Sequence, residues 1–361
     1  MTAVGVDTAT TARAVWAELG HRGDLRALVE AGQPPLHVEA GALSALVEQL
    51  ESSVAPGPML SVCVQVASVL PLLRGCAAGS AVADEVLAGM IRGETMVALA
   101  VTDAQLSGSG LLDLRTRATR DAGGIVLTGG KEWITNATDC DFALVLARTD
   151  GARRVTSHSW VLVPKGRRGV RVESATDAVL AGSGLGHLHF DDVRLDADHL
   201  VGRTGRALPE LARQLTAERL IGALWARTTC RRILRETRNY LATRSTGQGT
   251  LWDNASVQER FAGCLVDLAH LDAMCAAAAD VNAMTAAHGM LLKASYASAT
   301  ERILTAVIAL RGADSFRDGG MSQLREQLAM FAIAGGATAT MLAGVADHAE
   351  EFLCPERSRS H

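Results

Sequence analysis

The chain has 361 residues, of which 48% are hydrophobic and 20% charged, so it can bury a full core and form two or three domains. Its 35 Lys and Arg against 39 Asp and Glu residues give a net charge of −4, which excludes a general electrostatic attraction to nucleic acid or to an anionic membrane. The opening residues lack a basic segment followed by an apolar core, so we expect a cytoplasmic protein without a membrane partner.

The spacing of apolar residues changes twice along the chain. From about residue 8 to residue 91 they recur every three or four positions, as at Leu43, Leu46 and Leu50, which predicts helices. From about 96 to 201 short β-branched runs alternate with glycine and Asp/Ser/Thr clusters, which is typical of an antiparallel barrel or sandwich. The expected strands are 96–101, 125–127, 142–146, 159–163, 170–172 and 188–193.

Helical spacing returns in the last part of the chain. Four long segments are separated by short polar or glycine-containing joints, so an antiparallel bundle is expected. These segments are 208–243, 255–287, 290–310 and 321–352. The sequence therefore predicts an α+β protein with an N-terminal helical domain (1–95), an antiparallel β-domain (96–203) and a C-terminal four-helix bundle (204–361).

The run from Lys131 to Asn136 ends a strand-like segment of the β-domain. An isoalloxazine ring needs a flat apolar wall and a few neutral hydrogen-bond partners, and Trp133-Ile134-Thr135 offers both. We interpret this run as flavin-binding. No dinucleotide-binding glycine motif, Walker loop or zinc-spaced Cys/His set is evident, and His187 and His189 lack a third ligand at a firm spacing, so no metal is predicted.

Four short motifs occur together in a fixed order. They are Val101-Thr102-Asp103, the Lys131 to Asn136 run, Phe190-Asp191-Asp192-Val193 followed by His199-Leu200-Val201-Gly202, and the run from Leu215 to Leu220. In this order and context the chain resembles the acyl-CoA dehydrogenase family from about Leu60 to Ala349, and that family has the same three-region layout. The resemblance implies FAD as the cofactor.

The resemblance also assigns the residues around the flavin ring. Val101 and Thr102 would lie near its pyrimidine edge, and Trp133 and Thr135 beside its face and N5. Ser109 resembles the family's serine near cofactor and substrate.

The other end of the cofactor is bound across subunits in this family. Arg244 resembles the arginine that pairs with the FAD pyrophosphate of a neighbouring protomer, and Gln258 a polar contact nearby. Gly312 retains one glycine of the turn near the adenosine half. Alternatively, Arg244 is a cation that interacts with the dipole at a helix C-terminus. A cross-subunit FAD site implies a homodimer or homotetramer.

The family places its catalytic base at one of two positions. In many members it is a glutamate in a Glu-Gly-Thr segment, but the matching stretch here contains Gly335 and no carboxylate. Isovaleryl-CoA and long-chain acyl-CoA dehydrogenases carry the base in a Glu-Arg-Leu on the first bundle helix, which matches Glu218 and the two residues after it. Gly335 keeps the backbone N–H that helps to bind the thioester carbonyl in the family.

Helical spacing supports Glu218 independently of the resemblance. It shares the inward-facing stripe of Leu211, Leu215 and Trp225. A carboxylate on such a stripe is costly to bury or has a raised pKa, which suits a base near neutral pH, and Gly222 would leave room for a ligand. The alternatives are a salt bridge to a neighbouring helix or a partly exposed boundary position.

The resemblance implies a dehydrogenation in which Glu218 takes the proton alpha to a thioester carbonyl and the beta carbon passes a hydride to flavin N5. The product would be a trans-2-enoyl thioester. The acyl group could be carried on coenzyme A or on an acyl carrier protein, and the electron acceptor could be an electron-transfer flavoprotein or oxygen. The Ala- and Arg-rich composition and the divergent adenosine-side motifs favour specialised biosynthesis.

Two other functions remain open on the same scaffold. One is a flavin monooxygenase or nitrososynthase, which needs oxygen at the reduced flavin and no glutamate base. The other is a non-catalytic family member that serves as a scaffold or binding module.

Overall fold

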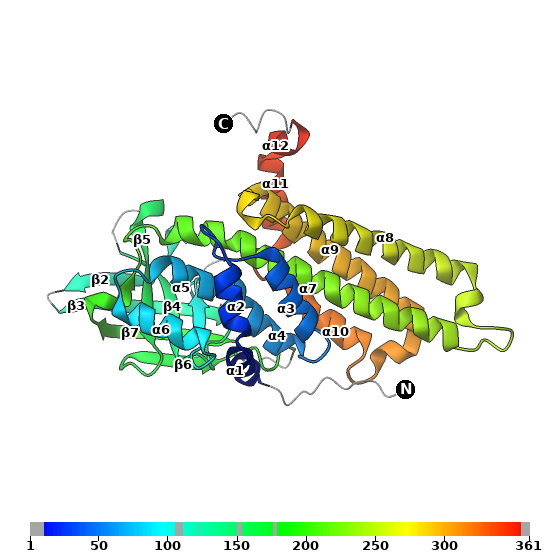
Figure 1. Cartoon of the computed structure of the whole chain (residues 1–361), viewed down its shortest axis with the longest axis horizontal. Helices are drawn as coiled ribbons and strands as arrows, with labels where there is room; N and C mark the ends of the chain where they lie inside the picture. The colour runs from blue at the N-terminus through cyan, green and yellow to red at the C-terminus, as the bar shows by residue number, and fades with distance from the viewer. Residues whose placement is uncertain (1–10, 105–110, 122, 150–153, 176–178, 355–361) are drawn as a thin grey trace. The chain divides into compact units, whose positions relative to one another are not determined.

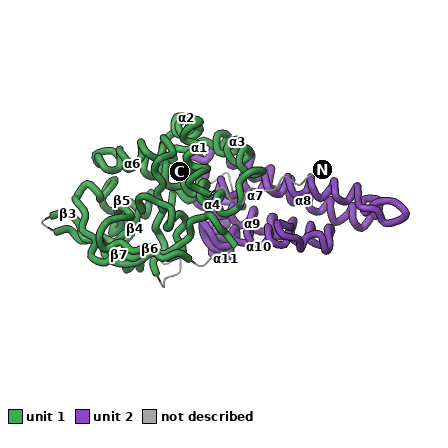
Figure 2. The backbone as a smooth tube through the Cα atoms, turned by 90° about the horizontal axis from the view of Figure 1, so that it is seen from below, with its two compact units in different colours: residues 1–218 green, residues 219–361 purple. Residues whose placement is uncertain are grey.

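A computed structural model describes residues 11–104, 111–121, 123–149, 154–175 and 179–354 (Figure 1). The chain divides into two compact units, residues 1–218 and residues 219–361 (Figure 2). Unit 1 contains both the N-terminal helices and the β-sheet. The domain boundaries expected near residues 95 and 203 stay a prediction, because the division into two compact units does not test them.

The first part of unit 1 is helical, as expected. Its elements are α1 (Ala12–Arg22), α2 (Asp24–Ala31), α3 (Ala40–Leu50), α4 (Pro56–Val64), the π-helical turn η1 (Gln65–Val69), α5 (Leu70–Cys76) and α6 (Ala81–Ile91). Side chains at Thr11, Glu39 and Ser80 accept hydrogen bonds from the first-turn amides of α1, α3 and α6, which explains where these helices begin. The stretch Pro56–Cys76 is long and apolar enough to cross a membrane, but 78% of its apolar window is buried in the fold, as in a core helix.

The second part of unit 1 is a twisted, mostly antiparallel sheet. Within the described residues it has eight strands, in the order β6-β7-β3-β2-β4-β5-β8, with β1 paired to β4. They are β1 (Val97–Ala100), β2 (Arg117–Asp121), β3 (Gly124–Ile134), β4 (Phe142–Arg148), β5 (His158–Pro164), β6 (Val170–Ser174), β7 (Gly186–Leu195) and β8 (Leu200–Val201). Alternate residues such as Leu127, Val145 and Val161 form its buried core.

Three strands differ from the sequence expectation, among them the short β8, which was not expected. β2 was not expected, because Arg117–Asp121 is polar; it forms by pairing along its length with β3. β3 extends through two glycines to Ile134, far beyond the predicted 125–127. At Gly129, with φ 141°, an added Cβ would lie 2.6 Å from the Cα of Thr116, so this close passage requires glycine.

Unit 2 is helical. The long helix α7 (Ala207–Thr243) begins in unit 1 and continues into unit 2. It is followed by α8 (Ala255–Ala277), α9 (Ala286–Arg311), η7 (Gly312–Phe316), α10 (Met321–Leu328), η8 (Ala329–Ala332), α11 (Thr338–Asp347) and α12 (Ala349–Leu353). The predicted fourth bundle helix is therefore broken, because Gly335 and Gly336 adopt φ 69° and 113°. The predicted fold class, with helical ends and an antiparallel-rich middle sheet, is confirmed.

Candidate active site

A buried ion pair fixes the segment after β1 on strand β3. The Nζ atom of Lys131, which is 0% exposed, lies 2.6 Å from Asp103 Oδ1 and donates to the carbonyl of Val101 at 2.8 Å. Asp103 also accepts hydrogen bonds from the amide of Thr116 at 2.9 Å and its hydroxyl at 2.7 Å. Burial lowers the pKa of Lys131 to about 8 against the opposing effect of Asp103. Burial would raise the pKa of Asp103, but Lys131 and the Thr116 bonds hold it below its ordinary value.

The structure brings Val101 and Thr102 beside the C-terminal end of strand β3, which carries Trp133. The amide of Glu132 donates to the carbonyl of Thr102 at 3.0 Å, directly before Trp133. Trp133 is 64% exposed and has a left-handed φ of 57°, which is uncommon for a bulky residue and is held here by two contacts to His187. Its amide donates to His187 Nδ1 at 3.3 Å, and the two rings meet edge-on at 5.2 Å.

These residues fit a flavin ring. An exposed indole offers a flat apolar face, and Thr135, two residues further on, is half-buried and has no hydroxyl hydrogen-bond partner among the described residues. Ser109 lies outside the described residues. The roles assigned to Val101, Thr102, Trp133 and Thr135 stay predictions. The contact of Trp133 with His187, which was discounted as a metal ligand, was not foreseen from the sequence.

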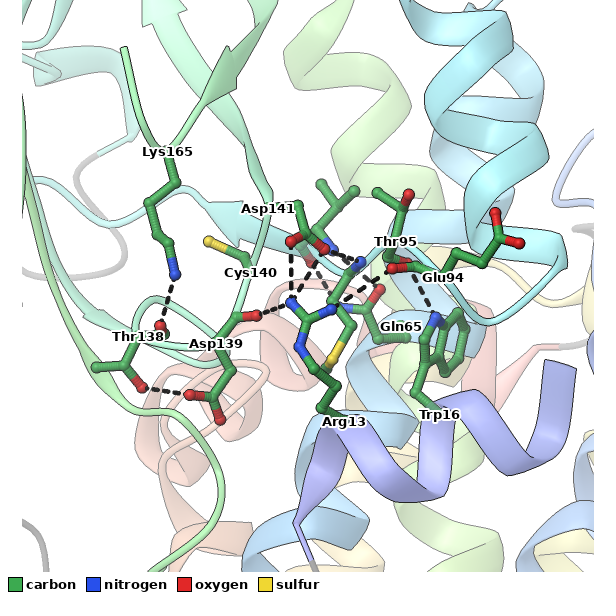
Figure 3. Close-up of polar contacts among 12 residues, drawn as sticks. Arg13, Trp16, Gln65, Glu94, Thr95, Thr138, Asp139, Cys140, Asp141 and Lys165 are labelled. Atoms are coloured by element: carbon green, nitrogen blue, oxygen red, sulfur yellow. Dashed lines mark hydrogen bonds and ion pairs between the residues drawn. The ribbon is translucent and has the colours of Figure 1, made fainter. Parts of the chain in front are cut away.

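The loop that follows Thr135 is fixed by two side chains and one backbone amide from other segments (Figure 3). Arg13 Nη2 on α1 lies 3.0 Å from both carboxylate oxygens of Asp141 and also donates to the carbonyl of Asp139. Lys165 donates to the carbonyl of Thr138 at 2.8 Å, and Asp141 accepts from the amide of Met96 at 2.9 Å. Sequence spacing gave no signal for these contacts, because Arg13 and Asp141 are 128 residues apart.

Glu218 is the last residue of unit 1 and is half-buried. Its Oε2 accepts a hydrogen bond of 2.8 Å from the hydroxyl of Ser68, which is 1% exposed and lies in the π-helical turn η1. Leu211 and Trp225 are buried, as the inward stripe requires. Sequence reasoning found the carboxylate but not Ser68, which lies 150 residues away in the chain.

Gly335 lies in unit 2, between η8 and α11. The carbonyl of Gly335 accepts from Arg219 Nε at 3.4 Å, and four residues earlier the carbonyl of Phe331 accepts from the fully buried Lys293. Within the described residues, the amide of Gly335 donates to no acceptor. An amide held in this way can donate to the oxygen of a ligand.

The expectation that Gly222 leaves space for a ligand needs correction. A Cβ built at Gly222 would lie 2.7 Å from the phenolic oxygen of Tyr296 on α9. The ring of Tyr296 in turn meets that of Phe331 edge-on at 5.3 Å. Glycine at this position therefore makes room for a tyrosine of the same unit.

The three residues predicted for the far end of FAD lie around the last turns of α7, within unit 2. Arg244 directly follows α7, is exposed, and its carbonyl accepts from the amide of Leu251 at 2.9 Å. Gln258, also exposed, donates to the carbonyl of Trp252 at 2.9 Å, and the guanidinium of Arg238 on α7 lies 3.7 Å from the centre of the Trp252 ring.

Gly312 ends α9 with a left-handed φ of 58°. The residue before it, Arg311, accepts a hydrogen bond of 3.3 Å at its carbonyl from Tyr240, one turn before Arg244. Nη2 of Arg311 lies 3.3 Å from Asp314 Oδ2, and among the described residues its Nε and Nη1 are buried without a hydrogen-bond partner. The roles of Arg244, Gln258 and Gly312 stay predictions.

The described part of the chain combines a helical region, an antiparallel-rich sheet that carries the exposed indole of Trp133, and a second helical region. Residues 98–193 match the model of the acyl-CoA dehydrogenase middle domain, and residues 209–350 match that of the acyl-CoA dehydrogenase C-terminal domain. The chain belongs to the acyl-CoA dehydrogenase family. This membership confirms the predicted family and its cofactor, FAD.

Individual relatives are similar over parts of their length. The chain is 31% identical to the mitochondrial long-chain specific acyl-CoA dehydrogenase of Rattus norvegicus over 182 residues, which are 50% of this chain and 42% of that protein. The match thus spans less than half of that curated relative.

Two solved structures share the fold. The crystal structure of an acyl-CoA dehydrogenase from Geobacillus kaustophilus has a TM-score of 0.84 at 20% identity and covers 94% of this chain and 90% of its own. The prolyl acyl carrier protein oxidase AnaB has a TM-score of 0.84 at 16% identity, with 93% and 90% covered.

Proposed function

We propose that this protein is an FAD-dependent dehydrogenase that converts a saturated acyl thioester into its trans-2-enoyl thioester. The observation that carries this proposal is the half-buried Glu218 carboxylate, held by Ser68, in a chain whose residue 335 is a glycine. Membership of the acyl-CoA dehydrogenase family supports it.

The residues divide the work as follows. Val101, Thr102, Trp133 and Thr135 would hold the ring, with Ser109 near cofactor and substrate. Bound FAD supplies the acceptor for the hydride that leaves the beta carbon. Glu218 removes the proton from the alpha carbon, so the electron pair of that C–H bond forms the new double bond.

The amide of Gly335 donates to the thioester carbonyl oxygen, where negative charge develops as the alpha proton leaves. Arg219 and Lys293 hold the carbonyls of Gly335 and Phe331, so the backbone is tied down on both sides of this amide. Such a donor contributes to the rate only when it is aimed in advance at the developing charge.

Arg244, Gln258 and Gly312 would bind the pyrophosphate and adenosine half of an FAD shared with a second subunit, so we propose a homodimer or homotetramer. Two observations support this. Within the described residues, Arg244 has no carboxylate partner, and unit 2 exposes large apolar side chains that association could cover. Among the described residues these are Leu265, Val266, Phe316, Ile333, Leu342 and Leu353.

For the substrate, we propose an acyl group on coenzyme A or on an acyl carrier protein, in specialised metabolism and in the cytoplasm. The similarity to a carrier-protein oxidase of the same fold supports the carrier-protein option. The electron acceptor would be an electron-transfer flavoprotein or oxygen.

The test is anaerobic titration of the purified protein with a panel of coenzyme A and carrier-protein thioesters, while the visible band of oxidised flavin is followed. At least one thioester should bleach the band and yield the enoyl product. Glu218→Gln should bind FAD normally and reduce it about 10²- to 10⁴-fold more slowly, because the general base is lost.

A matched control is Glu236→Gln, an exposed glutamate on the same helix that pairs with Arg232. The flavin band of this variant should bleach at the wild-type rate. Full bleaching of Glu218→Gln at the wild-type rate would remove the proposed role of this carboxylate.

A further inference from the structure

A π-helical turn interrupts the long buried helix of unit 1. All five residues of η1, Gln65–Val69, are buried, and residues 56–73 contain no charged side chain. A π turn widens the helical ladder and frequently marks a functional site. The polar groups that this turn presents to its neighbours are therefore neutral side chains and backbone carbonyls.

The turn holds helix α7 at two points. The hydroxyl of Ser68 donates to Glu218 Oε2 at 2.8 Å, and the carbonyl of Ala67 accepts from Gln214 Nε2 at 2.6 Å. Gln214 and Glu218 are four residues apart and lie on the same face of α7. Two contacts one turn apart fix how far α7 is shifted along its axis and how it is rotated about that axis. They thereby fix the position of the Glu218 carboxylate.

The same turn also holds strand β1. Val97 donates its amide to Gln65 Oε1 at 3.3 Å, and its carbonyl accepts from Gln65 Nε2 (Figure 3). β1 leads directly into Val101 and Thr102. One π-helical turn thus contacts both the helix that carries the proposed base and the strand that leads to the proposed flavin segment.

We propose that Ser68 is a positioning residue for Glu218, so that removal of its hydroxyl slows proton abstraction without weakening substrate or FAD binding. This inference rests on the proposed function. A hydrogen bond to an ionised carboxylate fixes its orientation and is stronger than a bond between neutral groups. Because proton transfer requires close geometry, a displacement of about 1 Å costs about 10²-fold in rate.

The experiment compares Ser68→Ala and Ser68→Thr with the wild-type holoenzyme, with the thioester that bleaches the wild-type flavin fastest as the probe. Flavin reduction in Ser68→Ala should be about 10- to 100-fold slower, with the KM for the thioester and the FAD content within about twofold of wild type. Ser68→Thr keeps a hydroxyl and should recover most of the rate.

A second readout separates proton abstraction from redox chemistry. In D₂O, Ser68→Ala should exchange the alpha proton of the thioester more slowly by the same factor. If Ser68→Ala does not fold, Ser68→Cys replaces it, because a thiol has a similar shape but is a weak donor.

Ser80→Ala is the matched control. Ser80 is also buried in unit 1, and its hydroxyl donates to the carbonyl of Asp198 at 2.8 Å instead of to Glu218. Its melting temperature should fall as that of Ser68→Ala does, while the rate stays near wild type. An equal slowing in Ser80→Ala, or a wild-type rate in Ser68→Ala and Ser68→Cys, would overturn the inference. If no thioester bleaches the wild-type protein, the proposed function itself fails, and the inference with it.

Discussion

The buried pair of Lys131 and Asp103 predicts a large and pH-dependent effect of one substitution. Lys131→Met removes the ammonium and keeps an unbranched apolar side chain of similar length. The exposed fractions of the two side chains are 0% and 2%, so Asp103 would remain as a buried carboxylate without a cation. Removal of one partner of such a pair costs about 3–5 kcal/mol of the free energy of unfolding.

Two features of the site place the expected loss at the lower end of this range, about 3 kcal/mol. Asp103 keeps the amide and hydroxyl of Thr116 as donors, and its Oδ2 also accepts from the amide of Arg115. With a urea m value of about 1–3 kcal/mol/M, the midpoint of unfolding should fall by about 1 M or more. Circular dichroism in urea at pH 7 measures this difference.

The pH dependence follows from the direction of each pKa shift. In the wild type the pKa of Asp103 is below its ordinary value, so its contribution is present above about pH 4 and is lost as the pH falls through the folded pKa. In Lys131→Met burial dominates and raises the pKa of Asp103, so the folded variant binds a proton more readily than its unfolded chain. The stability difference between the two proteins should therefore be largest at pH 7 and shrink towards pH 4.

Lys165→Met provides the matched control, because Lys165 is half-buried and, within the described part of the chain, donates a hydrogen bond only to the carbonyl of Thr138. Lys165→Met should lower the free energy of unfolding by about 1 kcal/mol. A stability loss in Lys131→Met no larger than in Lys165→Met, or a loss that does not change between pH 7 and pH 4, would refute the reasoning.

Two further predictions concern the cofactor residues. His187→Ala removes the acceptor that holds the left-handed Trp133 backbone. Acrylamide quenching of the tryptophan fluorescence of FAD-free protein should therefore change, and FAD affinity should fall about 5- to 10-fold. His189→Ala, which among the described residues loses a 3.4 Å contact to Glu173, should leave both unchanged if the effect belongs to His187. Arg244→Gln should weaken FAD binding by about 10-fold or more and make this binding less dependent on salt, as measured by fluorescence titration. Arg232→Gln, on helix α7, should change neither the affinity nor its salt dependence. Equal FAD affinity in both variants would leave Arg244 as a helix-terminal cation.

The spacing of apolar residues predicted those helices and strands that bury one side and expose the other. The alternation of Phe142 to Leu146 predicted β4, and the three/four spacing along α7 predicted its inward face, because burial on one side selects apolar residues at a fixed period. Strand β2 was not predicted, for the opposite reason. Its polar sequence has no period of its own, and it becomes a strand through its partner β3.

The breaks in the helices show a similar limit. The expected helix 255–287 ends at Ala277, and Asp280 then caps a new turn at the amide of Asn282. Asp280 was visible in the sequence, but helical apolar spacing continued past it and outweighed the cap signal. At Gly335-Gly336 the spacing likewise continued, although two glycines in left-handed conformations end the helix.

The proposed base and the proposed carbonyl donor depend on different kinds of structure. Glu218 projects from an unbroken helix, so its place on the inward stripe follows from residues three and four positions away, and a sequence can reveal it. Its orientation depends on Ser68, in a turn whose π-helical character no spacing rule indicates. Gly335 contributes a backbone amide that is available because the helix is interrupted at that point, and a glutamate side chain there would have to adopt the left-handed backbone, at a cost of about 1 kcal/mol. A chain that carries its carboxylate at residue 218 avoids that strain and still keeps the amide.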